Sequence, residues 1–445
     1  MTKTMIPLAL LFASLTLHVN PSSASADTRQ NIQDSASGPA VNPVVQWNRA
    51  LLVIVRSAGA QPATVHSTRS FAMMHAAIYD AVNAIDRTHR PYRVRLSRAS
   101  RDASQEAAAA AAAHRVLESL YPTFQAMLDI ELQLSLQPIP EGQARTDGIA
   151  IGETVGDRIL ALRGADGSDA QPIPYVFGSQ PGDYQSTPPN FPPQPQFTHW
   201  QFVNPFALHR ANRFRPIPPP DLASNHYADD FNEVKTVGIM DSTIRTPDES
   251  EIGRFWNGPI QNYWNEIAQS ASLARQLSTA QTARLFALLD LSLADGVIAF
   301  YDAKYTYNFW RPVTAIRAAD PDINPQTLPD PNWLPQSTNT APDPSYPGAH
   351  AVLSTAGATA LSFALDTDDI DLTVTSEVLP GVQRSFHSFS AAGQEATLSR
   401  VLAGQHFRFD ETAGQHLGQR VADFVAEHLL LPRHRGEHES GNDNE

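Results

Sequence analysis

The sequence lacks several features on which common protein chemistries depend. None of its 445 residues is a cysteine, which excludes disulfide bonds, zinc–thiolate sites, iron–sulfur clusters and cysteine nucleophiles. It also contains no G-x-x-x-x-G-K-[ST] phosphate loop, no H-E-x-x-H zinc helix and no G-x-S-x-G nucleophile elbow. Alternating runs typical of strands are scarce, and residues 371–374 form the clearest of them. The sequence therefore predicts a mostly α-helical fold with none of these common reactive motifs.

Long hydrophobic runs are also missing, apart from a short one near the start of the chain. Lys3 precedes an apolar segment over residues 5–13, and a small-residue A-x-A pattern ends at Ala26. This arrangement is typical of a secretory signal peptide, and the apolar run is shorter than the ~20 residues that cross a bilayer. We expect residues 1–26 to be removed and the mature protein to be periplasmic or secreted, without membrane contact.

The sequence contains fewer basic than acidic residues. Lys and Arg total 32 against 46 Asp and Glu, which gives a net charge of −14. An acidic surface disfavours nucleic acids and anionic membranes, so we expect neither as a partner. A site for an anion would have to be a local cluster of basic residues. Amphipathic helices serve cores and interfaces alike, so no oligomeric state follows from the sequence.

Hydrophobic residues recur at three- and four-residue steps through most of the chain, which predicts amphipathic helices. We expect a single helical domain over residues 45–432, with a polar arm at 27–44 before it and a disordered tail at 433–445 after it. Its C-terminal half, about residues 279–430, carries the motifs described below. The expected helices are 71–82, 103–121, 124–136, 142–163, 226–240, 279–310, 349–365, 389–403 and 411–430.

Two proline-rich segments separate the predicted helices. Residues 172–220 contain 13 prolines, through which no helix can continue, and a second such segment covers residues 321–347. Aromatic residues are interleaved with the prolines of the first segment. That segment therefore either packs as one wall of a pocket or serves as a spacer between two helical halves.

The first of three candidate clusters contains Lys304 and Arg311, seven residues apart on either side of an aromatic run. Seven residues make almost two helical turns, so both cations can point to the same side of one helix. Pro312 restricts Arg311 and is expected to end that helix. The alternative is a pair of surface cations that share no ligand.

The second cluster is Gly348-Ala349-His350, which follows Tyr346-Pro347 at the start of a predicted helix. Free N–H groups at a helix start attract anions. The imidazole of His350, with an ordinary pKa near 6.5, suits proton exchange with a bound group. The alternative is a histidine that caps the helix or is merely packed.

The third cluster contains Arg400 and His406. The planar guanidinium of Arg400 suits phosphate-like oxygens. Six positions would place the two side chains on different sides of a continuous helix, so Gly404 is expected to end the helix and turn His406 back toward the site. The alternative is a helix C-cap with a buried histidine.

Together the three clusters supply what one tetrahedral oxyanion needs: cations, N–H groups at a helix end, and histidines. Their order, K-x6-R-P, then P-x-x-H, then S-R-x5-H, resembles the vanadium-dependent haloperoxidase and type 2 phosphatidic acid phosphatase superfamily. Residues 74–86, 386–392 and 406–410 resemble its bacterial haloperoxidase-like branch. The resemblance implies an all-α helical-bundle fold with long proline-rich loops.

The resemblance also implies roles for the clustered residues. Lys304, Arg311 and Arg400 would bind the oxygens of vanadate or phosphate. His350 would be the acid–base residue. His406 would be the axial ligand of vanadium in a peroxidase, or the phosphorylated nucleophile in a phosphatase. Members of the peroxidase type oxidise a halide with hydrogen peroxide, and the metal acts as a Lewis acid.

One motif departs from the family pattern. The family usually has P-S-G-H where this chain has Pro347-Gly348-Ala349-His350, so the serine hydroxyl that donates to the oxyanion is missing. The backbone N–H groups of Gly348 and Ala349 remain as expected anion donors. A lost hydrogen bond to a charged group weakens binding by about 1.5–3 kcal/mol.

The expected function is that of a vanadium-dependent haloperoxidase-like enzyme. Its cofactor would be vanadate, with phosphate able to occupy the same site, and its partners would be hydrogen peroxide and a halide or small organic substrate. Two alternatives stay open. One is a periplasmic acid phosphatase that hydrolyses phosphate monoesters through His406, and the other is a non-catalytic vanadate- or phosphate-binding protein.

Overall fold

Helices make up most of the structure, a computed structural model that describes residues 42–320 and 323–433. The expected all-α fold is confirmed, with one two-stranded hairpin added. The predicted signal peptide at 1–26 lies outside the described residues, as do most of the predicted arm at 27–44 and of the predicted tail at 433–445.

Helix α2 (Pro43–Arg56) begins inside the predicted arm, so the arm prediction is wrong for residues 43 and 44. The Asn42 side chain caps this helix by accepting a hydrogen bond from the Val44 N–H at 3.0 Å. Proline at the first helical position is well suited to such a start. Val44 and Val45 are fully buried, which fixes the helix start against the core.

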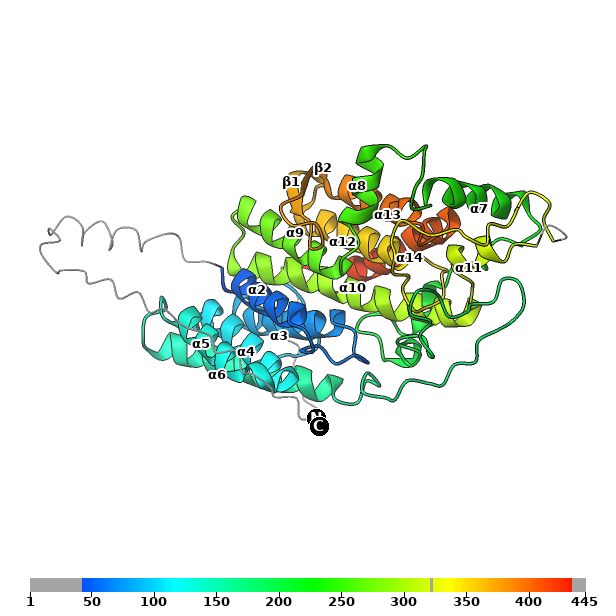
Figure 1. The fold of residues 1–445 in the computed structure, drawn as a ribbon. Coiled ribbons are helices and arrows are strands. Elements are labelled where there is room, and N and C mark those ends of the chain that lie inside the picture. The colour runs from blue at the N-terminus through cyan, green and yellow to red at the C-terminus, as the bar shows by residue number, and fades with distance from the viewer. Residues whose placement is uncertain (1–41, 321–322, 434–445) are drawn as a thin grey trace, which may run out of the picture. The chain divides into compact units, whose positions relative to one another are not determined.

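The helices form an N-terminal group and a C-terminal group (Figure 1). The first group consists of α2, α3 (Thr68–Asp86), α4 (Gln105–Leu120), η1 (Pro122–Phe124), α5 (Gln125–Leu136) and α6 (Gln143–Arg163). After the short turns η2 (Trp200–Phe202) and η3 (Ala211–Phe214), the second group consists of α7 (Asn225–Val237), α8 (Pro247–Phe255), α9 (Ile260–Ala274), α10 (Thr279–Tyr307), α11 (Pro312–Arg317), α12 (Ala349–Leu365), α13 (Phe389–Leu402) and α14 (Arg408–His428).

The sequence reasoning did not predict α8 and α9. The apolar residues of α9, among them Ile260, Tyr263 and Trp264, recur at helical spacing, so the pattern that predicts a helix is present there. Several polar residues are buried beside them. Asn265 shows the reason for their burial, because its side chain bonds Asn48 at 2.6 Å and Asp290 at 3.0 Å inside the core. Such polar partners are distant in the sequence, so the pattern within α9 alone does not reveal them.

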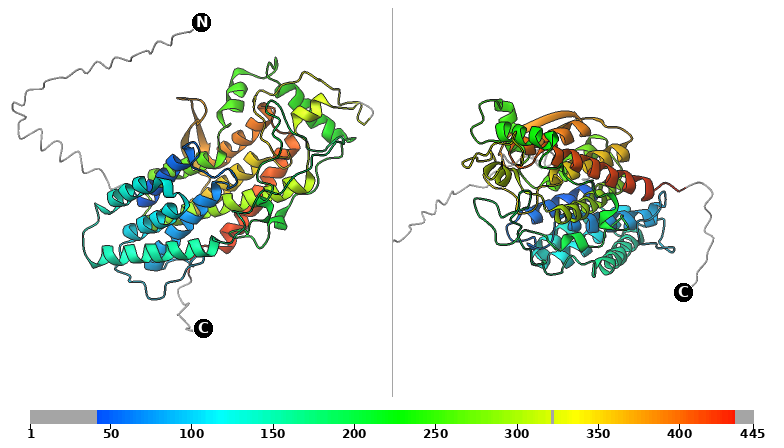
Figure 2. Two further views of the ribbon diagram at one scale, coloured as in Figure 1. Left: turned by 60° about the horizontal axis from the view of Figure 1, so that its bottom comes forward. Right: turned by 90° about the vertical axis from the view of Figure 1, so that its right-hand side faces the viewer.

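Helix α10 is the central element of the fold. Its 29 residues give it a length of about 43 Å, and nearly every residue from Thr282 to Lys304 is buried. It packs against α3 of the first group and against α12 and α14 of the second. Figures 1 and 2 show the blue and cyan helices α2–α6 on one side of it and the yellow-to-red helices α12–α14 on the other. One end of α10 therefore reaches the region of the motifs.

Small residues bring two helix pairs into close contact. A Cβ atom at Gly152 of α6 would lie 2.4 Å from the carbonyl oxygen of Ala108 in α4. A Cβ atom at Gly418 of α14 would lie 2.1 Å from the carbonyl oxygen of Val352 in α12. The second contact fixes the relative position of the two helices that begin beside the motifs.

The first proline-rich segment packs against α10, as the pocket-wall alternative requires. The carboxylate of Asp295 in α10 accepts hydrogen bonds from three consecutive backbone N–H groups, residues 206–208, at 2.6–2.8 Å. Earlier in the segment, the ring of Phe197 lies 5.4 Å from that of Tyr301. Tyr175 donates to Asn308 at 3.0 Å. The segment is thus held along the last turns of α10 and does not act as a free spacer.

The predicted strand at residues 371–374 is present within β1 (Asp369–Thr375). It pairs antiparallel with β2 (Gln383–Ser388), and its buried residues, Leu372 and Val374 among them, alternate with exposed ones. The hairpin leads directly into α13. It contributes no residue to the motifs.

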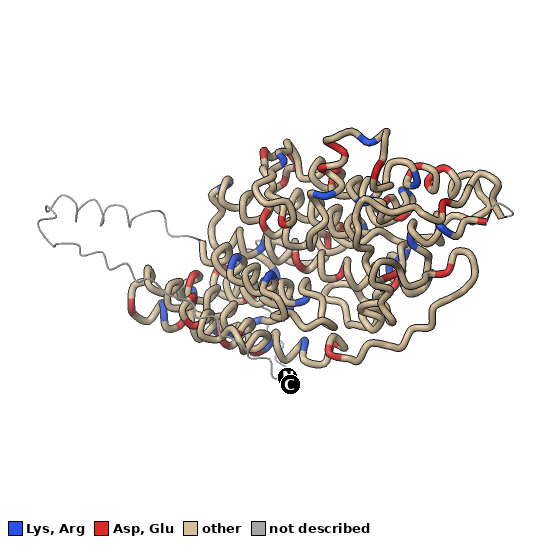
Figure 3. Tube along the Cα trace, viewed as in Figure 1, with Lys and Arg blue, Asp and Glu red and all other residues tan. Residues whose placement is uncertain are grey.

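Charged residues of both signs are interspersed along the chain, as Figure 3 shows. Within the described part of the chain, every helix falls short of the length and apolar character that crossing a bilayer demands.

We predict that Gly152→Ala destabilises the protein although alanine favours helices. The new methyl group meets the backbone of α4, so the free energy of unfolding should fall by about 1–3 kcal/mol. Denaturant titration followed by circular dichroism measures the change. Glu153→Ala, at an exposed position of the same helix, is the control and should shift stability by less than about 0.5 kcal/mol. Equal stability of the two variants would contradict the close packing.

Candidate active site

A cavity of about 410 Å³ contains most of the predicted site residues. Arg311, His350, Arg400 and His406 line one part of it together with Ala349. They come from the loop after α10, the first turn of α12, the last turn of α13 and the connection between α13 and α14. The rest of the cavity is lined by aromatic and apolar side chains such as Phe197, Tyr301 and Leu353 and by polar ones such as His66, Gln261 and Asn262. Side chains from three distant motifs thus meet in one place.

Lys304 and Arg311 converge, but for a different reason from the one predicted. Helix α10 ends at Asn308, which has a left-handed conformation (φ 49°), so Arg311 does not continue the helical face of Lys304. Both cations instead contact Asp343. The Lys304 ammonium lies 3.1 Å from Asp343 Oδ1, and Arg311 bonds the carboxylate through Nη2 and the carbonyl oxygen through Nε at 2.9 Å.

Lys304 lies behind the cavity wall. Its ammonium is fully buried and also donates to the carbonyl oxygens of Pro344 and, at 3.1 Å, Ser345. Burial lowers the pKa of Lys304 to about 8, although Asp343 acts to raise it. Among the described residues, those that line the cavity do not include Lys304. It therefore adds positive potential to the site and holds Asp343, and it does not touch a ligand directly in this arrangement.

Asp343 is a site residue that sequence reasoning missed. Burial on its own raises the pKa of its carboxyl, but Lys304 and Arg311 outweigh this effect and hold the pKa below its usual value of 3.8. Gln196 of the proline-rich wall adds a hydrogen bond at 3.0 Å. The only signal in the sequence was an acidic residue seven positions before His350, and aspartate is too common in loops for that to stand out.

His406 is oriented from both sides of its ring. Gly404 ends the preceding helix with φ +74°, as predicted, and places His406 just before α14. Arg311 donates to Nε2 at 2.9 Å, and Nδ1 lies 3.1 Å from Asp410 Oδ2. Because a guanidinium only donates, Nε2 must accept and the proton must sit on Nδ1. Burial, followed by the nearby cations, lowers the pKa of His406 well below 6.5, so the ring is neutral.

Asp410 supports this orientation from the first turn of α14. Its Oδ2 accepts hydrogen bonds from Ser345 Oγ at 2.6 Å and from the Phe407 N–H at 3.1 Å. Burial raises the pKa of Asp410 to about 7. The bond to Ser345 links the motif at the start of α12 to the motif at the start of α14.

The start of α12 only partly matches the expected anion site. The Gly348 N–H donates to the backbone carbonyl of Asp410 at 2.9 Å, so the prediction that it bonds the anion is wrong for this arrangement. The reason is the close contact of α12 with α14. Ala349 and His350 open the helix and lack intrahelical partners for their N–H groups. Ala349 lines the cavity and keeps its predicted place.

His350 is held by the backbone of the α8–α9 connection. Its Nε2 lies 3.0 Å from the carbonyl oxygen of Trp256, which can only accept, so Nε2 carries the proton and Nδ1 is free to accept one. Burial, followed by Arg400, lowers the pKa of His350 well below 6.5. A neutral imidazole with an open Nδ1 is suited to act as a general base.

Arg400 retains an unused donor. Its Nη1 bonds Asn257 at 2.9 Å, while its buried Nε has no partner. Burial lowers the pKa of Arg400 to about 10, against the opposite effect of Glu411. A guanidinium stays protonated at that value near neutral pH. A buried cationic donor without a partner indicates that a polar ligand belongs beside it.

Glu411 is the second residue that sequence reasoning missed. Its side chain is buried, and neither carboxyl oxygen has a hydrogen-bond partner. Its Oε1 lies 3.7 Å from Nδ1 of His406. Burial, and next Asp410, raise the pKa of Glu411 to about 8, although Arg400 acts to lower it. No pattern in the sequence singles out this residue from the 46 acidic ones.

The donor set fits a tetrahedral oxyanion such as vanadate. The cavity offers two guanidinium groups, a helix start and His406, whose Nε2 accepts from Arg311 in this structure. The unpartnered Arg400 Nε calls for an acceptor. Three carboxyl groups stand close to the three cations. They limit the excess positive charge, but two of them have a raised pKa and hold protons near neutral pH.

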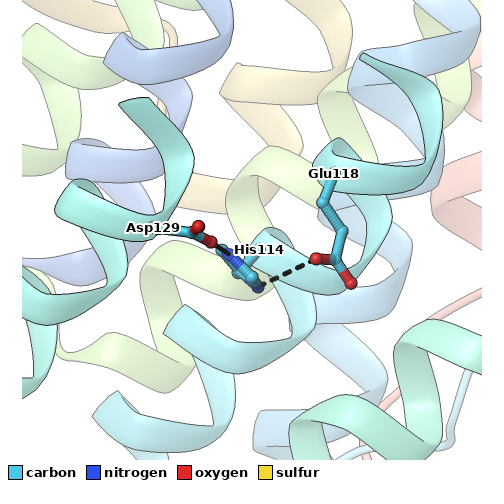
Figure 4. A group of neighbouring side chains, drawn as sticks. All are labelled: His114, Glu118 and Asp129. Atoms are coloured by element: carbon cyan, nitrogen blue, oxygen red, sulfur yellow. Dashed lines mark hydrogen bonds and ion pairs between the residues drawn. The ribbon is translucent and has the colours of Figure 1, made fainter. Parts of the chain in front are cut away.

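A separate group of His114, Glu118 and Asp129 lies in the N-terminal helices (Figure 4). His114 Nε2 bonds Asp129 at 2.8 Å, and Nδ1 lies 3.9 Å from Glu118, which also bonds Arg115 at 2.8 Å. Each ligand atom already has a partner of opposite character. This group is explained as an ion-pair network that joins α4 to α5.

Comparison with known proteins agrees with the geometry. Residues 284–433 match the family model described as the VCPO second helical-bundle domain. The vanadium chloroperoxidase of Curvularia inaequalis is 26% identical over 465 aligned positions, which cover 79% of this chain and 75% of that protein. In sequence, this chain thus resembles vanadium-dependent haloperoxidases over most of its length. The matched segment contains all three motifs and both residues that the sequence reasoning missed.

Solved structures of vanadium-dependent haloperoxidases have the same fold. A bacterial vanadium-dependent iodoperoxidase is 24% identical and has a TM-score of 0.74, with 88% of this chain and 96% of that chain covered. The apo form of a bacterial vanadium-dependent chloroperoxidase has a TM-score of 0.61 at 16% identity, covering 83% of this chain and 93% of that one. The haloperoxidase fold therefore extends beyond the C-terminal half into the N-terminal helices.

We predict a pH-dependent stability difference between the wild type and Glu411→Gln. Folded Glu411 holds a proton up to about pH 8, whereas the unfolded group loses it near 4.5. The wild type should therefore lose stability relative to the variant as pH rises from about 5 to 7, by up to about 1.4 kcal/mol per pH unit. Denaturant titrations at several pH values measure this slope. A constant difference would show that the carboxyl is ionised throughout.

Proposed function

We propose that this protein is a vanadium-dependent haloperoxidase-like enzyme, which uses hydrogen peroxide to oxidise a halide at a vanadate site. One observation carries the proposal. Arg311, His350, Arg400 and His406, predicted from three separate motifs, line a single cavity, and Arg400 there has a buried donor without a partner. The match to the vanadium chloroperoxidase of Curvularia inaequalis supports the reaction type.

Residues in and behind the cavity wall have different roles in holding an oxyanion. Arg311 and Arg400 supply charge-assisted hydrogen bonds, and Lys304 adds positive potential from behind the wall. Their combined charge favours a bound anion even in a protein with a net charge of −14. Asp410 keeps the proton of His406 on Nδ1, so Nε2 would be the ligand atom once Arg311, which donates to it in this structure, bonds the oxyanion instead.

Bound vanadate would supply Lewis-acid activation of hydrogen peroxide. The chain supplies the proton handling beside it. His350 lines the cavity with its Nδ1 free, so it can take a proton from an incoming peroxide and return it to a leaving hydroxide. Its lowered pKa keeps it in the basic form when peroxide arrives.

The remaining cavity wall suits a small, weakly hydrated substrate. Phe197 and Tyr301 present ring surfaces next to the anion-binding end, and their rings contact each other at 5.4 Å. A halide loses water when it enters such a site, which makes it easier to oxidise. A small organic acceptor would meet the same aromatic surfaces.

We predict that vanadate alone switches on oxidation. Metal-free protein is mixed with orthovanadate, and halide oxidation by peroxide is assayed beside hydrolysis of p-nitrophenyl phosphate. Halide oxidation that needs vanadate is the expected result. Phosphate ester hydrolysis that vanadate inhibits would instead identify an acid phosphatase acting through His406. Inactivity in both assays with tight vanadate binding would identify a non-catalytic anion-binding protein.

Arg400→Ala is the variant that ties this activity to the cavity. It removes a direct donor and should abolish vanadate-dependent oxidation by lowering affinity about 100-fold or more, while circular dichroism stays unchanged. Arg420→Ala, an exposed position on α14, is the matched control and should keep wild-type rates. Wild-type activity of Arg400→Ala would refute the assignment of the site.

Export is part of the proposal. The basic start, the short apolar run and the A-x-A pattern support cleavage after Ala26. We predict that protein recovered from the periplasm or the medium begins at Asp27, as shown by N-terminal sequencing and intact mass. Full-length chains with Met1 that remain in the cytoplasm would contradict export.

A further inference from the structure

The cavity of the candidate active site is larger than an oxyanion requires. A tetrahedral anion with four oxygens needs about the room of four water molecules, roughly 120 Å³, whereas the cavity holds about 410 Å³. The charged side chains that line it are Arg311, Arg400 and Asp343, and the other described residues that line it include no Lys, Arg, Asp or Glu. The remaining space therefore suits a neutral molecule.

Four neutral polar residues form one side of that space, here called the polar wall: His66, Ser67, Gln261 and Asn262. The first two lie at the start of α3 and the last two in the first turn of α9. Gln261 Nε2 donates to Ser67 Oγ at 2.9 Å, and this bond joins the two chain segments. Three of the four side chains are at least nine-tenths buried, and His66 is the exception. The polar wall is thus part of the folded interior.

Asn262 carries an acceptor without a partner. Its Nδ2 donates to Glu377 at 3.3 Å, which distinguishes the nitrogen of the amide from its oxygen. Glu377 does not line the cavity, so Oδ1 lies on the side of the amide away from it. This Oδ1 is buried and has no hydrogen-bond partner. Buried acceptors are nearly always bonded, so a donor on a ligand belongs beside it.

His66 supplies a free donor to the same space. Its Nδ1 accepts from the Thr68 N–H at 3.4 Å, so the proton of the neutral ring sits on Nε2. Burial lowers the pKa of His66 to about 4, against the opposite effect of Asp343, which keeps the ring neutral. No hydrogen bond within the described part of the chain occupies Nε2. The ring lies 5.4 Å from that of Phe197, which in turn lies 5.4 Å from that of Tyr301.

The connection between α8 and α9 ties the polar wall to the residues that would hold the oxyanion. The Trp256 carbonyl oxygen lies 3.0 Å from His350 Nε2, and Asn257 accepts from Arg400 at 2.9 Å. Asn262 follows five positions later, so its Cα atom lies at most about 18 Å from that of Asn257. A ligand on the polar wall and an oxyanion would therefore be neighbours in one cavity.

We propose that the polar wall binds the hydroxyl group of a neutral phenol, which donates to Asn262 Oδ1 and accepts from His66 Nε2. A hydroxyl group both donates and accepts, as these two free atoms require. The ring surfaces of Phe197 and Tyr301 would hold the aromatic body, which an aliphatic alcohol lacks. A halide or a phenolate has no proton to donate to Asn262, so neither suits this place.

The role of the phenol as a halogen acceptor rests on the proposed function. Hydrogen peroxide takes two electrons from one halide ion and, with one proton, gives hypohalous acid and one water. A ring carbon of the phenol then forms a bond to the halogen. Its C–H bond breaks, and that proton leaves with the displaced hydroxide as a second water. A phenol held in the same cavity would meet the hypohalous acid before it escapes.

The test compares 4-fluorophenol with 4-fluoroanisole, in which a methyl group replaces the hydroxyl proton. Binding to the full-length protein is measured by fluorine NMR titration at about pH 7, where a phenol with a pKa near 10 is neutral. The anisole leaves Asn262 Oδ1 unpaired, so the wild type should bind the phenol about 5- to 100-fold more tightly. In Asn262→Leu this preference should fall to within about twofold. Equal affinities in the wild type, or an unchanged preference in the variant, would overturn the proposal.

A second variant guards against a folding defect of the first. His66→Phe keeps an aromatic ring and removes the Nε2 donor, which can bond the oxygen of either compound. Both affinities should fall by about 2- to 10-fold while their ratio stays at the wild-type value. Unchanged affinities in His66→Phe would overturn the role of His66. Asn332→Leu makes the same change as Asn262→Leu at an exposed position and should preserve both affinities.

Repeating the titration with saturating orthovanadate separates this proposal from the proposed function. The phenol should bind with an affinity within about twofold of that without vanadate, and mutual exclusion of the two would overturn the placement on the polar wall. Halide oxidation without a preference for the phenol over the anisole overturns the phenol site alone. A preference that depends on Asn262, in a protein without vanadate-dependent oxidation, supports the phenol site and overturns the proposed function.

Discussion

The balance of buried charge at the end of α10 is the constraint on which the rest of the site depends. Three cations and three carboxyl groups are buried within a few residues of the cavity: Lys304, Arg311, Arg400, Asp343, Asp410 and Glu411. A buried charge that loses its partner destabilises a fold by about 3–5 kcal/mol. The ionised Asp343 carboxylate therefore compensates Lys304 and Arg311, whereas Asp410 and Glu411, whose pKa values are raised, add less negative charge near neutral pH. This balance also limits how strongly the site attracts a multiply charged ligand.

The fold supplies this balance by bringing the ends of several helices together. Helix α10 ends beside the loop that carries Asp343, and the close packing of α12 on α14 places the Gly348 region against Asp410. Each contact joins residues that are more than thirty positions apart in sequence. The site is consequently a product of helix packing, and its geometry is set far from the residues that touch a ligand.

The sequence was sufficient to predict the cationic residues and histidines that would hold an anion. It was not sufficient to predict the carboxyl groups that lie beside them. Arg400 and His406 belong to a recognisable spacing, and Gly404 signalled the turn between them correctly. The Lys304–Arg311 argument reached a right conclusion through a helical face that does not exist, since α10 ends at Asn308. Asp343 and Glu411 carry no local signal, because their burial and their partners arise only in the folded chain.

The proline-rich wall has a consequence for how such a protein can diversify. Its anchor on α10 is the Asp295 carboxylate, whereas the part of it that faces the cavity, around Gln196 and Phe197, lies about ten residues earlier in the chain. Different residues of the segment thus attach it to α10 and line the cavity. Changes at the lining positions can reshape the room for an acceptor molecule while the anchor and the oxyanion cradle keep their places. The residues of the wall that line the cavity can therefore vary while the residues that would hold the oxyanion stay the same.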